Sequence, residues 1–215
     1  ALGDKIFWKI IQALIEGVKD LKFVPKDLMD IETALCDTYY ANFSVFQSLP
    51  DSWAIGHLFP VMPVHRLDEM PSRNAILADI TCDCDGKIDR FIDKQGVRRA
   101  LRLHTVKENE DYYLGVFLVG AYQETLGDLH NLLGDTNVVS IRVHEDGTYS
   151  FVREIEGDTV ADVLTYVEYE PKNMTKQFRA IAEQAIRENL ITPQERRQIM
   201  NMYEEGLRGY PYFEQ

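Results

Sequence analysis

Apolar residues recur at helical spacing in the first forty positions. Between Lys5 and Leu21 the stripe consists of Phe7, Ile10, Ile11, Leu14, Ile15, Val18 and Leu21. This spacing is typical of an amphipathic helix that buries one face. A second helix can begin at Pro25, and its stripe consists of Leu28, Ile31, Leu35 and Tyr39. Residues 1–40 are therefore predicted to form a helical hairpin whose stripes pack in a core.

The pattern then changes to short apolar runs separated by turn residues. Residues 41–72 contain prolines and scattered aromatic residues without a period, which predicts a loop-rich connection with short strands. Further strands are predicted at residues 75–81, 113–122, 138–144 and 149–152. Asp146 and Gly147 between the last two are typical of a hairpin turn. The middle of the chain is therefore predicted to be rich in β-structure.

The C-terminal part returns to helical signals. A short helix can start at residues 159–162, and longer helices are predicted at residues 176–189 and 193–205. Thr192, Pro193 and Glu195 combine an N-cap, a proline at the first helical position and a capping box. Glycines at positions 206 and 209 should end the last helix, and the aromatic tail that follows is expected to pack on the sheet.

The charge balance narrows the range of partners. The 215 residues include 35 acidic and 23 basic side chains, which give a formal net charge of -12. Negative charge opposes binding to nucleic acid phosphates or anionic lipid, and it suits a cationic small substrate. The most apolar run, residues 114–120, is the size of a strand and not of a membrane span. We therefore expect neither nucleic acid nor membrane as a partner.

The termini and cysteines indicate a reducing compartment. The first residues lack the basic start and the cleavage site of a signal peptide. Three cysteines, an odd number with two of them separated by one residue, make a poor disulfide framework. The sequence therefore predicts a cytoplasmic protein.

The stretch from Ile80 to Asp89 contains the most suggestive chemistry. Cys82 and Cys84 are each followed by an aspartate, and Gly86 closes the run. No second cysteine or histidine cluster completes a zinc site, and the acidic spacing does not match a calcium loop. One interpretation is a strand that ends at Cys82 and turns into the next strand. The other is a strand end that presents a thiol for proton transfer and carboxylates for a cation.

A second suggestive stretch is the strand that runs into Gly120, Ala121 and Tyr122. The small residues allow a backbone or a ligand to approach the tyrosine closely. The plainer interpretations are that Tyr122 is a core residue with a locally bonded hydroxyl, and that His130 packs on a helix face. The residues alone leave these alternatives open.

Four strings carry a resemblance to a known family. In chain order they are NFSVFQSLPDSW at 42–53, ITCDCDGKID at 80–89, GAYQETLGDLHNLLGD at 120–135 and GDTVAD at 157–162. Together they resemble the C-terminal region of the biosynthetic arginine decarboxylases, from about residue 30 onward. The resemblance implies a fold that is mainly β with α: a β-barrel domain of the alanine racemase-like enzymes at residues 41–215, with flanking helices. Residues 1–40 would be part of a helical insertion.

The resemblance also implies an activity and a site. The family uses pyridoxal phosphate to convert arginine to agmatine and carbon dioxide in polyamine and spermidine biosynthesis, and magnesium is a second candidate cofactor. Cys82 matches the catalytic cysteine. Asp83, with Asp85 and Asp51 as further candidates, would bind the cationic end of arginine, and Tyr122 would contact the cofactor near its phosphate. No metal ligand is assigned to the chain.

Two departures from the family qualify these expectations. The family string usually has serine at the position of Cys84, so Cys84 is interpreted as a tolerated small residue. The (β/α)8 barrel that carries the Schiff-base lysine takes about 250 residues, more than this whole chain. The chain is therefore expected to be a C-terminal fragment, inactive alone, that needs the barrel domain. In the family's head-to-tail dimer, the lysine of each active site comes from the other subunit.

The leading hypothesis is thus an arginine decarboxylase fragment that supplies the cysteine and aspartate half of a composite active site. A second hypothesis is a non-catalytic interaction module that assembles with or regulates a pyridoxal phosphate decarboxylase. A third, an independent metal-binding protein, would require stoichiometric metal on the purified chain.

Overall fold

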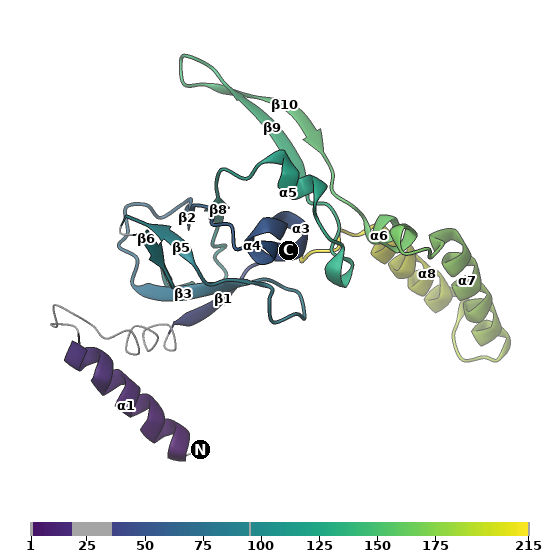
Figure 1. Cartoon of the computed structure of the whole chain (residues 1–215). Coiled ribbons are helices and arrows are strands. Elements are labelled where there is room, and N and C mark those ends of the chain that lie inside the picture. The colour runs from purple at the N-terminus through teal and green to yellow at the C-terminus, as the bar shows by residue number, and fades with distance from the viewer. Residues whose placement is uncertain (1, 19–35, 95, 215) are drawn as a thin grey trace. The chain divides into compact units, whose positions relative to one another are not determined.

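The structure is a computed structural model that describes residues 2–18, 36–94 and 96–214 (Figure 1). The chain divides into two compact units that interleave along the sequence. The first unit consists of Ala1–Ala41, Gly56–Ala78 and Lys87–Val119, and the second of Asn42–Ile55, Asp79–Gly86 and Gly120–Gln215. The predicted boundary at residue 40 stays a prediction, because residues 19–35 lie outside the described part.

The N-terminal helix is confirmed, whereas the second half of the hairpin is not. Helix α1 spans Leu2–Val18. Within the described residues, Ile11 is the buried member of its apolar stripe, and Phe7 is more than half exposed. Most of the predicted second helix falls on residues 19–35, outside the described part. Its last stripe residue, Tyr39, lies instead in strand β1 (Asp37–Tyr40), so the helix prediction is wrong there.

The first unit is built around strand β3 (Arg73–Ala78), whose Ala75 and Leu77 are buried at alternate positions. β1 pairs with one edge of β3 in parallel. The other edge is shared by β7 (Leu101–Leu103) and β4 (Lys87–Ile88), both antiparallel. Alternate burial along β3 is the period-two pattern that the sequence predicted for residues 75–81.

The remaining strands of this unit form two small ribbons. β2 (Val61–Pro63) pairs with β8 (Leu114–Val116), and β5 (Phe91–Asp93) pairs with β6 (Gly96–Arg98). The described residues form a mixture of helices and small sheets, which agrees only in part with the predicted mainly β class, and no closed β-barrel is present among them. Closure requires each strand to pair along both edges, and partners of two or three residues leave most edges unpaired.

The second unit begins with two short helices where the sequence predicted loops and strands. Helix α3 spans Val45–Ser48 and helix α4 spans Pro50–Ala54. The Ser44 hydroxyl accepts a hydrogen bond from the Gln47 N–H at 3.2 Å, and Pro50 occupies the first turn of α4. These are ordinary helix start signals in a segment too short to show a helical period.

The predicted hairpin forms a ribbon in the second unit (Figure 1). Strand β9 (Val138–Val143) pairs antiparallel with β10 (Tyr149–Ile155), with a register irregularity between Phe151 and Arg153. At the tip, Gly147 has a positive φ of 82°, which glycine adopts without strain. The Asp-Gly turn signal is therefore confirmed.

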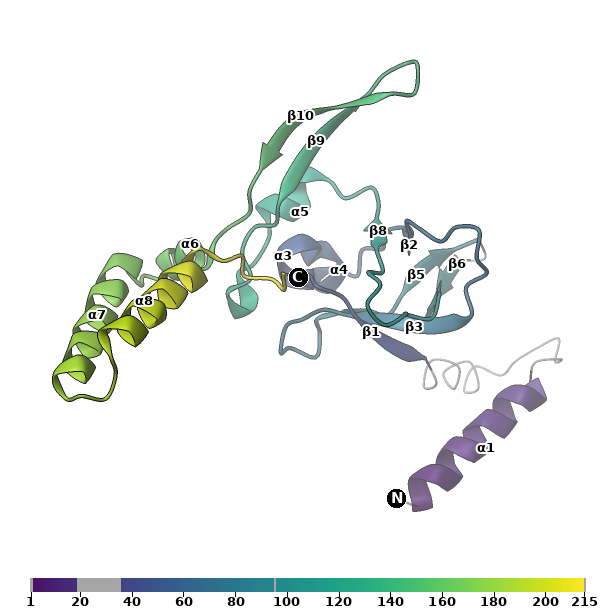
Figure 2. The ribbon, with the colours of Figure 1, turned by 180° about the vertical axis from the view of Figure 1, so that it is seen from behind.

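Three helices complete the second unit and lie side by side in both views (Figure 1, Figure 2). They are α6 (Val160–Tyr166), α7 (Pro171–Arg187) and α8 (Pro193–Arg208). Thr159 and Thr192 begin the first and last of these with complete capping boxes. The box at Thr192 was predicted, whereas at Thr159 the sequence predicted only the start of a helix. Phe178 stacks on Tyr203 with ring centroids 4.3 Å apart, which joins α7 to α8.

The aromatic tail is only partly packed. The Tyr212 side chain is buried and its hydroxyl donates to the Gly134 carbonyl at 2.8 Å, whereas Phe213 is exposed. In the part of the chain that the structure covers, no helix has both the length and the apolar character needed to cross a membrane.

Candidate functional site

The stretch that holds two cysteines forms a turn built around the buried side chain of Asp79. One carboxylate oxygen of Asp79 accepts the Thr81 N–H and hydroxyl at 2.9 and 2.7 Å. The other oxygen accepts the Val45 N–H at 2.8 Å. The Asp79 N–H in turn donates to the Gly86 carbonyl at 2.8 Å, which closes the turn. A carboxylate with three donors is fully supplied with partners although it is 2% exposed.

Gly86 fits this turn because any side chain would overlap it. A Cβ at this position would lie 2.2 Å from Asp79 Oδ1 and 2.4 Å from Thr81 Oγ1. The Gly86 N–H donates to the Asp83 carbonyl at 3.0 Å, and the Asp85 N–H donates to Asp83 Oδ1 at 2.9 Å. The predicted turn is therefore confirmed, but strand β3 ends at residue 78 and not at Cys82.

Cys82 lies exposed on this turn and contacts a residue that the sequence interpretation had not singled out. Asn131 Oδ1 accepts the Cys82 N–H at 3.0 Å, and Asn131 Nδ2 donates to Cys82 Sγ at 3.3 Å. The two residues are 49 positions apart. Asn131 belongs to one of the strings that carried the family resemblance, but no local pattern points from it to the cysteine.

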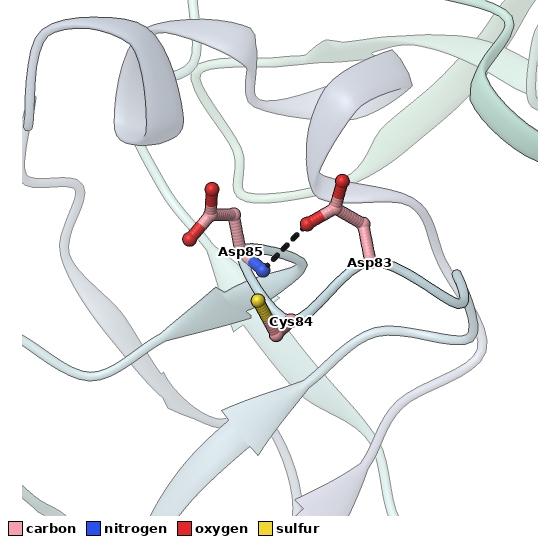
Figure 3. Close-up of side chains that lie close together, drawn as sticks. All are labelled: Asp83, Cys84 and Asp85. Carbon is pink, nitrogen blue, oxygen red and sulfur yellow. Dashed lines mark hydrogen bonds between the residues drawn. The ribbon is translucent and has the colours of Figure 1, made fainter.

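The three residues after Cys82 form an exposed cluster (Figure 3). One ligand atom from each of Asp83, Cys84 and Asp85 lies within 4.8 Å of the others. A zinc site takes about four ligands and a calcium site six or more, and all three of these side chains are exposed. The cluster alone does not define a metal centre. Its carboxylates remain suited to a cationic group of a substrate.

Asp51 and Tyr122 belong to a second location in the second unit, where Asp51 bonds to Gln123, the residue after Tyr122. Tyr122 is in helix α5 (Ala121–Thr125), so the prediction that the strand continues to residue 122 is wrong. The neighbouring Gln123 is buried, donates to Asp51 Oδ2 at 2.6 Å and accepts the Asp51 N–H at 3.1 Å. The Tyr122 side chain is 80% exposed and is not the core tyrosine that the plainer interpretation expected.

The short segment of α3 and α4 supports both locations. Val45 in α3 binds Asp79 of the cysteine turn, and Asp51 in α4 binds Gln123 of α5. The loop that carries Asn131 is also fixed to α3, where the Asp128 N–H donates to the Phe46 carbonyl at 3.0 Å. The five predicted site residues therefore fall into two groups on one support: Cys82, Asp83 and Asp85 on the turn, and Asp51 and Tyr122 across α4 and α5.

A further bond ties the end of the same loop to α3. Gln47 Nε2 donates to Asp135 Oδ1 at 2.6 Å, and the Asp135 N–H donates to Asp158 at 2.9 Å. Desolvation raises the pKa of Asp135, and the neighbouring charges of Asp158 and Glu124 raise it further, while the bond from Gln47 opposes them. The loop thus carries a carboxyl that is costly to ionise, bonded to Gln47 of α3.

Comparisons with known proteins agree on one family. Residues 160–213, which comprise α6 to α8, match the family described as the arginine decarboxylase C-terminal helical extension. The biosynthetic arginine decarboxylase of Gloeobacter violaceus is 49% identical over 99% of this chain and 34% of its own length. That of Nostoc sp. is 46% identical over 99% of this chain and 31% of its own length.

A solved structure agrees with the sequence matches. The crystal structure of the biosynthetic arginine decarboxylase from Campylobacter jejuni has a TM-score of 0.72 and 32% identity, and it covers 95% of this chain and 36% of that one. The chain thus spans about a third of the length of these relatives. By sequence and fold, the chain is similar to the C-terminal region of the biosynthetic arginine decarboxylases.

Proposed function

We propose that this chain is the part of a cytoplasmic arginine decarboxylase that supplies Cys82 and Asp83 to a composite active site. The whole enzyme would convert arginine to agmatine and carbon dioxide, as the names of its relatives suggest. The observation that supports this role best is the Cys82 thiol, which is exposed yet held by Asn131 on a turn with a buried frame. A thiol that is both accessible and oriented suits proton transfer.

The cofactor of this proposal is pyridoxal phosphate, and the exposed Tyr122 could contact its phosphate. Tyr122 presents an exposed ring and hydroxyl in the first turn of α5, and a Cβ at the preceding Gly120 would meet nothing within 4 Å. An approaching group therefore meets little steric hindrance there, and the hydroxyl can donate one hydrogen bond to a phosphate. The Schiff-base lysine would come from a barrel domain, in the second subunit of a head-to-tail dimer.

When bound, pyridoxal phosphate supplies the electron sink for loss of the carboxylate. The residues of this chain would bind the substrate guanidinium and deliver a proton. The carboxylate of Asp83 would accept hydrogen bonds from the substrate guanidinium, and its bond from the Asp85 N–H fixes its orientation. The S–H of Cys82 would deliver the proton that replaces the departing carboxylate.

Matched cysteine variants test this role in a full-length arginine decarboxylase that carries this sequence. Agmatine formation is measured for Cys82→Ala and for Cys84→Ala. We expect Cys82→Ala to lower kcat about a hundredfold, the lower range for loss of a general acid. Cys84→Ala should leave kcat within about twofold, since Cys84 is assigned no catalytic role. Equal turnover in the Cys82 variant and the unmodified enzyme would refute the assignment.

An aspartate pair on the same turn tests substrate binding. Asp83→Asn should raise the KM for arginine by roughly tenfold or more, because a charge-assisted bond is lost. Asp85→Asn is the matched control on the same turn and should raise the KM less.

The alternative function, a non-catalytic module that assembles with the decarboxylase, makes a different prediction. It requires tight association of this chain with the barrel-containing part but no effect of Cys82→Ala or Asp83→Asn on turnover. The contact between Asn131 and the exposed Cys82 thiol favours the catalytic role, because a surface used only for assembly would gain little from a thiol held in one orientation.

A further inference from the structure

The side-chain amide of Asn131 bridges two atoms of Cys82, and the orientation of that amide follows from chemistry. The backbone N–H of Cys82 can only donate, so the group 3.0 Å from it must be the amide oxygen. The amide nitrogen then faces the sulfur at 3.3 Å. Because Nδ2 donates to Sγ, the S–H hydrogen of Cys82 points away from Asn131.

The backbone of Asn131 is shaped for this contact. Its φ of 59° and ψ of 22° place it in the left-handed region, which asparagine tolerates better than most residues. On one side the His130 ring packs against Phe46 with centroids 4.8 Å apart, and on the other side Leu133 is buried. Asn131 and Leu132 both adopt positive φ, of 59° and 57°, between the packed ring of His130 and the buried Leu133.

The turn residues that precede Cys82 are held independently of Asn131. The Ile80 N–H donates to the Phe43 carbonyl at 3.2 Å, and the Asp79 frame fixes Thr81. The turn that carries Cys82 and the loop that carries Asn131 are therefore each fixed by bonds of their own. The amide of Asn131 thus acts on the Cys82 N–H and on the rotation of the thiol about its Cα–Cβ bond, while the preceding turn residues keep their own supports.

We propose that Asn131 is a positioning residue that turns the S–H of Cys82 toward the reacting carbon. This inference rests on the proposed catalytic role of Cys82 and extends it to a second residue. Without the amide, the thiol can occupy other rotamers, and only a fraction of enzyme molecules would hold the proton in the productive direction. Loss of Asn131 should therefore lower kcat and leave the KM for arginine unchanged.

Two variants of the full-length enzyme separate this role from a structural one. Asn131→Gly keeps the left-handed backbone and removes the whole amide. Asn131→Asp keeps an oxygen for the Cys82 N–H and removes the donor to sulfur. We expect each to lower kcat by roughly tenfold with the KM for arginine within twofold, since misplaced reacting groups slow turnover without weakening binding.

A second readout does not depend on turnover. Alkylation of Cys82 and Cys84 by iodoacetamide is followed site by site by peptide mass spectrometry. We expect both variants to change the rate at Cys82 by at least threefold and to leave the rate at Cys84 unchanged. Unchanged kcat and an unchanged alkylation rate at Cys82 in both variants would overturn the role of Asn131. Full activity of Cys82→Ala would instead overturn the catalytic role on which it rests.

Discussion

The frame of the cysteine turn makes a sharp prediction for Gly86→Ala. The added Cβ would lie 2.2 Å from Asp79 Oδ1, closer than non-bonded atoms approach, and 2.4 Å from Thr81 Oγ1. Asp79 cannot simply move aside, because its carboxylate is buried and holds the Thr81 N–H, the Thr81 hydroxyl and the Val45 N–H. The substitution must therefore break part of the frame.

The size of the effect follows from the bonds that are lost. Rotating the Asp79 carboxylate away from the new methyl group gives up both bonds to Thr81. A hydrogen bond to a charged group contributes about 1.5–3 kcal/mol, so we expect the free energy of unfolding to fall by roughly 3 kcal/mol or more. A shift of the Gly86 backbone would instead strain the bond between its carbonyl and the Asp79 N–H.

Urea unfolding measures this change. In a Trp8→Phe background, the fluorescence of Trp53 reports on the second unit. The matched control is Gly206→Ala, inside helix α8, where a Cβ meets nothing within 4 Å. That change should raise the free energy of unfolding by about 0.5–1 kcal/mol, because alanine favours the helix. A loss below about 1 kcal/mol for Gly86→Ala would contradict the description of the turn as tightly closed.

Three further changes test other parts of the second unit by the same unfolding measurement. Thr159→Ala removes the cap of α6 and should cost about 1 kcal/mol. Tyr212→Phe leaves the Gly134 carbonyl without its donor and should also cost about 1 kcal/mol, since the hydroxyl is buried. Asp135→Asn should stabilise the unit slightly at pH 7. The pKa of Asp135 is raised by desolvation and by Asp158, so its ionised form costs stability above that raised pKa. The gain should shrink as the pH falls through the raised pKa towards 4, and a gain that grows instead would contradict this reasoning.

Elements that depend on neighbours in the sequence were predictable. The helix start at Thr159, the capping box at Thr192 and the Asp146-Gly147 turn are satisfied within a few residues, and each was found where the sequence placed it. Tyr122 was misplaced in a strand because helix α5 is held by a distant bond, from Gln123 to Asp51, 72 positions away. Local propensity says little about an element of five residues whose stability is tertiary.

The candidate site likewise combines a local feature that the sequence predicted with a contact between distant residues that it did not predict. The turn at residues 79–86 could be predicted from its aspartates and glycine, which are common turn residues. The contact between Cys82 and Asn131 could not, because it joins two loops that are each fixed to the segment around α3. A closed barrel also failed to appear among the described residues, where the pairing of β3 is divided among partners joined over two to four residues. The number of residues that pair depends on the whole sheet, and the sequence of a single strand does not determine it.

The turn around Asp79 also separates the residues that give it shape from those that face solvent. Asp79 and Gly86 are buried and set the path of the backbone, whereas residues 82–85 are exposed between them. Side chains at positions 84 and 85 can therefore be exchanged while Asp83, which accepts the Asp85 N–H, is kept. A small combinatorial library at these two positions, with Asp79, Asp83 and Gly86 kept, would vary the exposed surface of the turn while its backbone path is preserved.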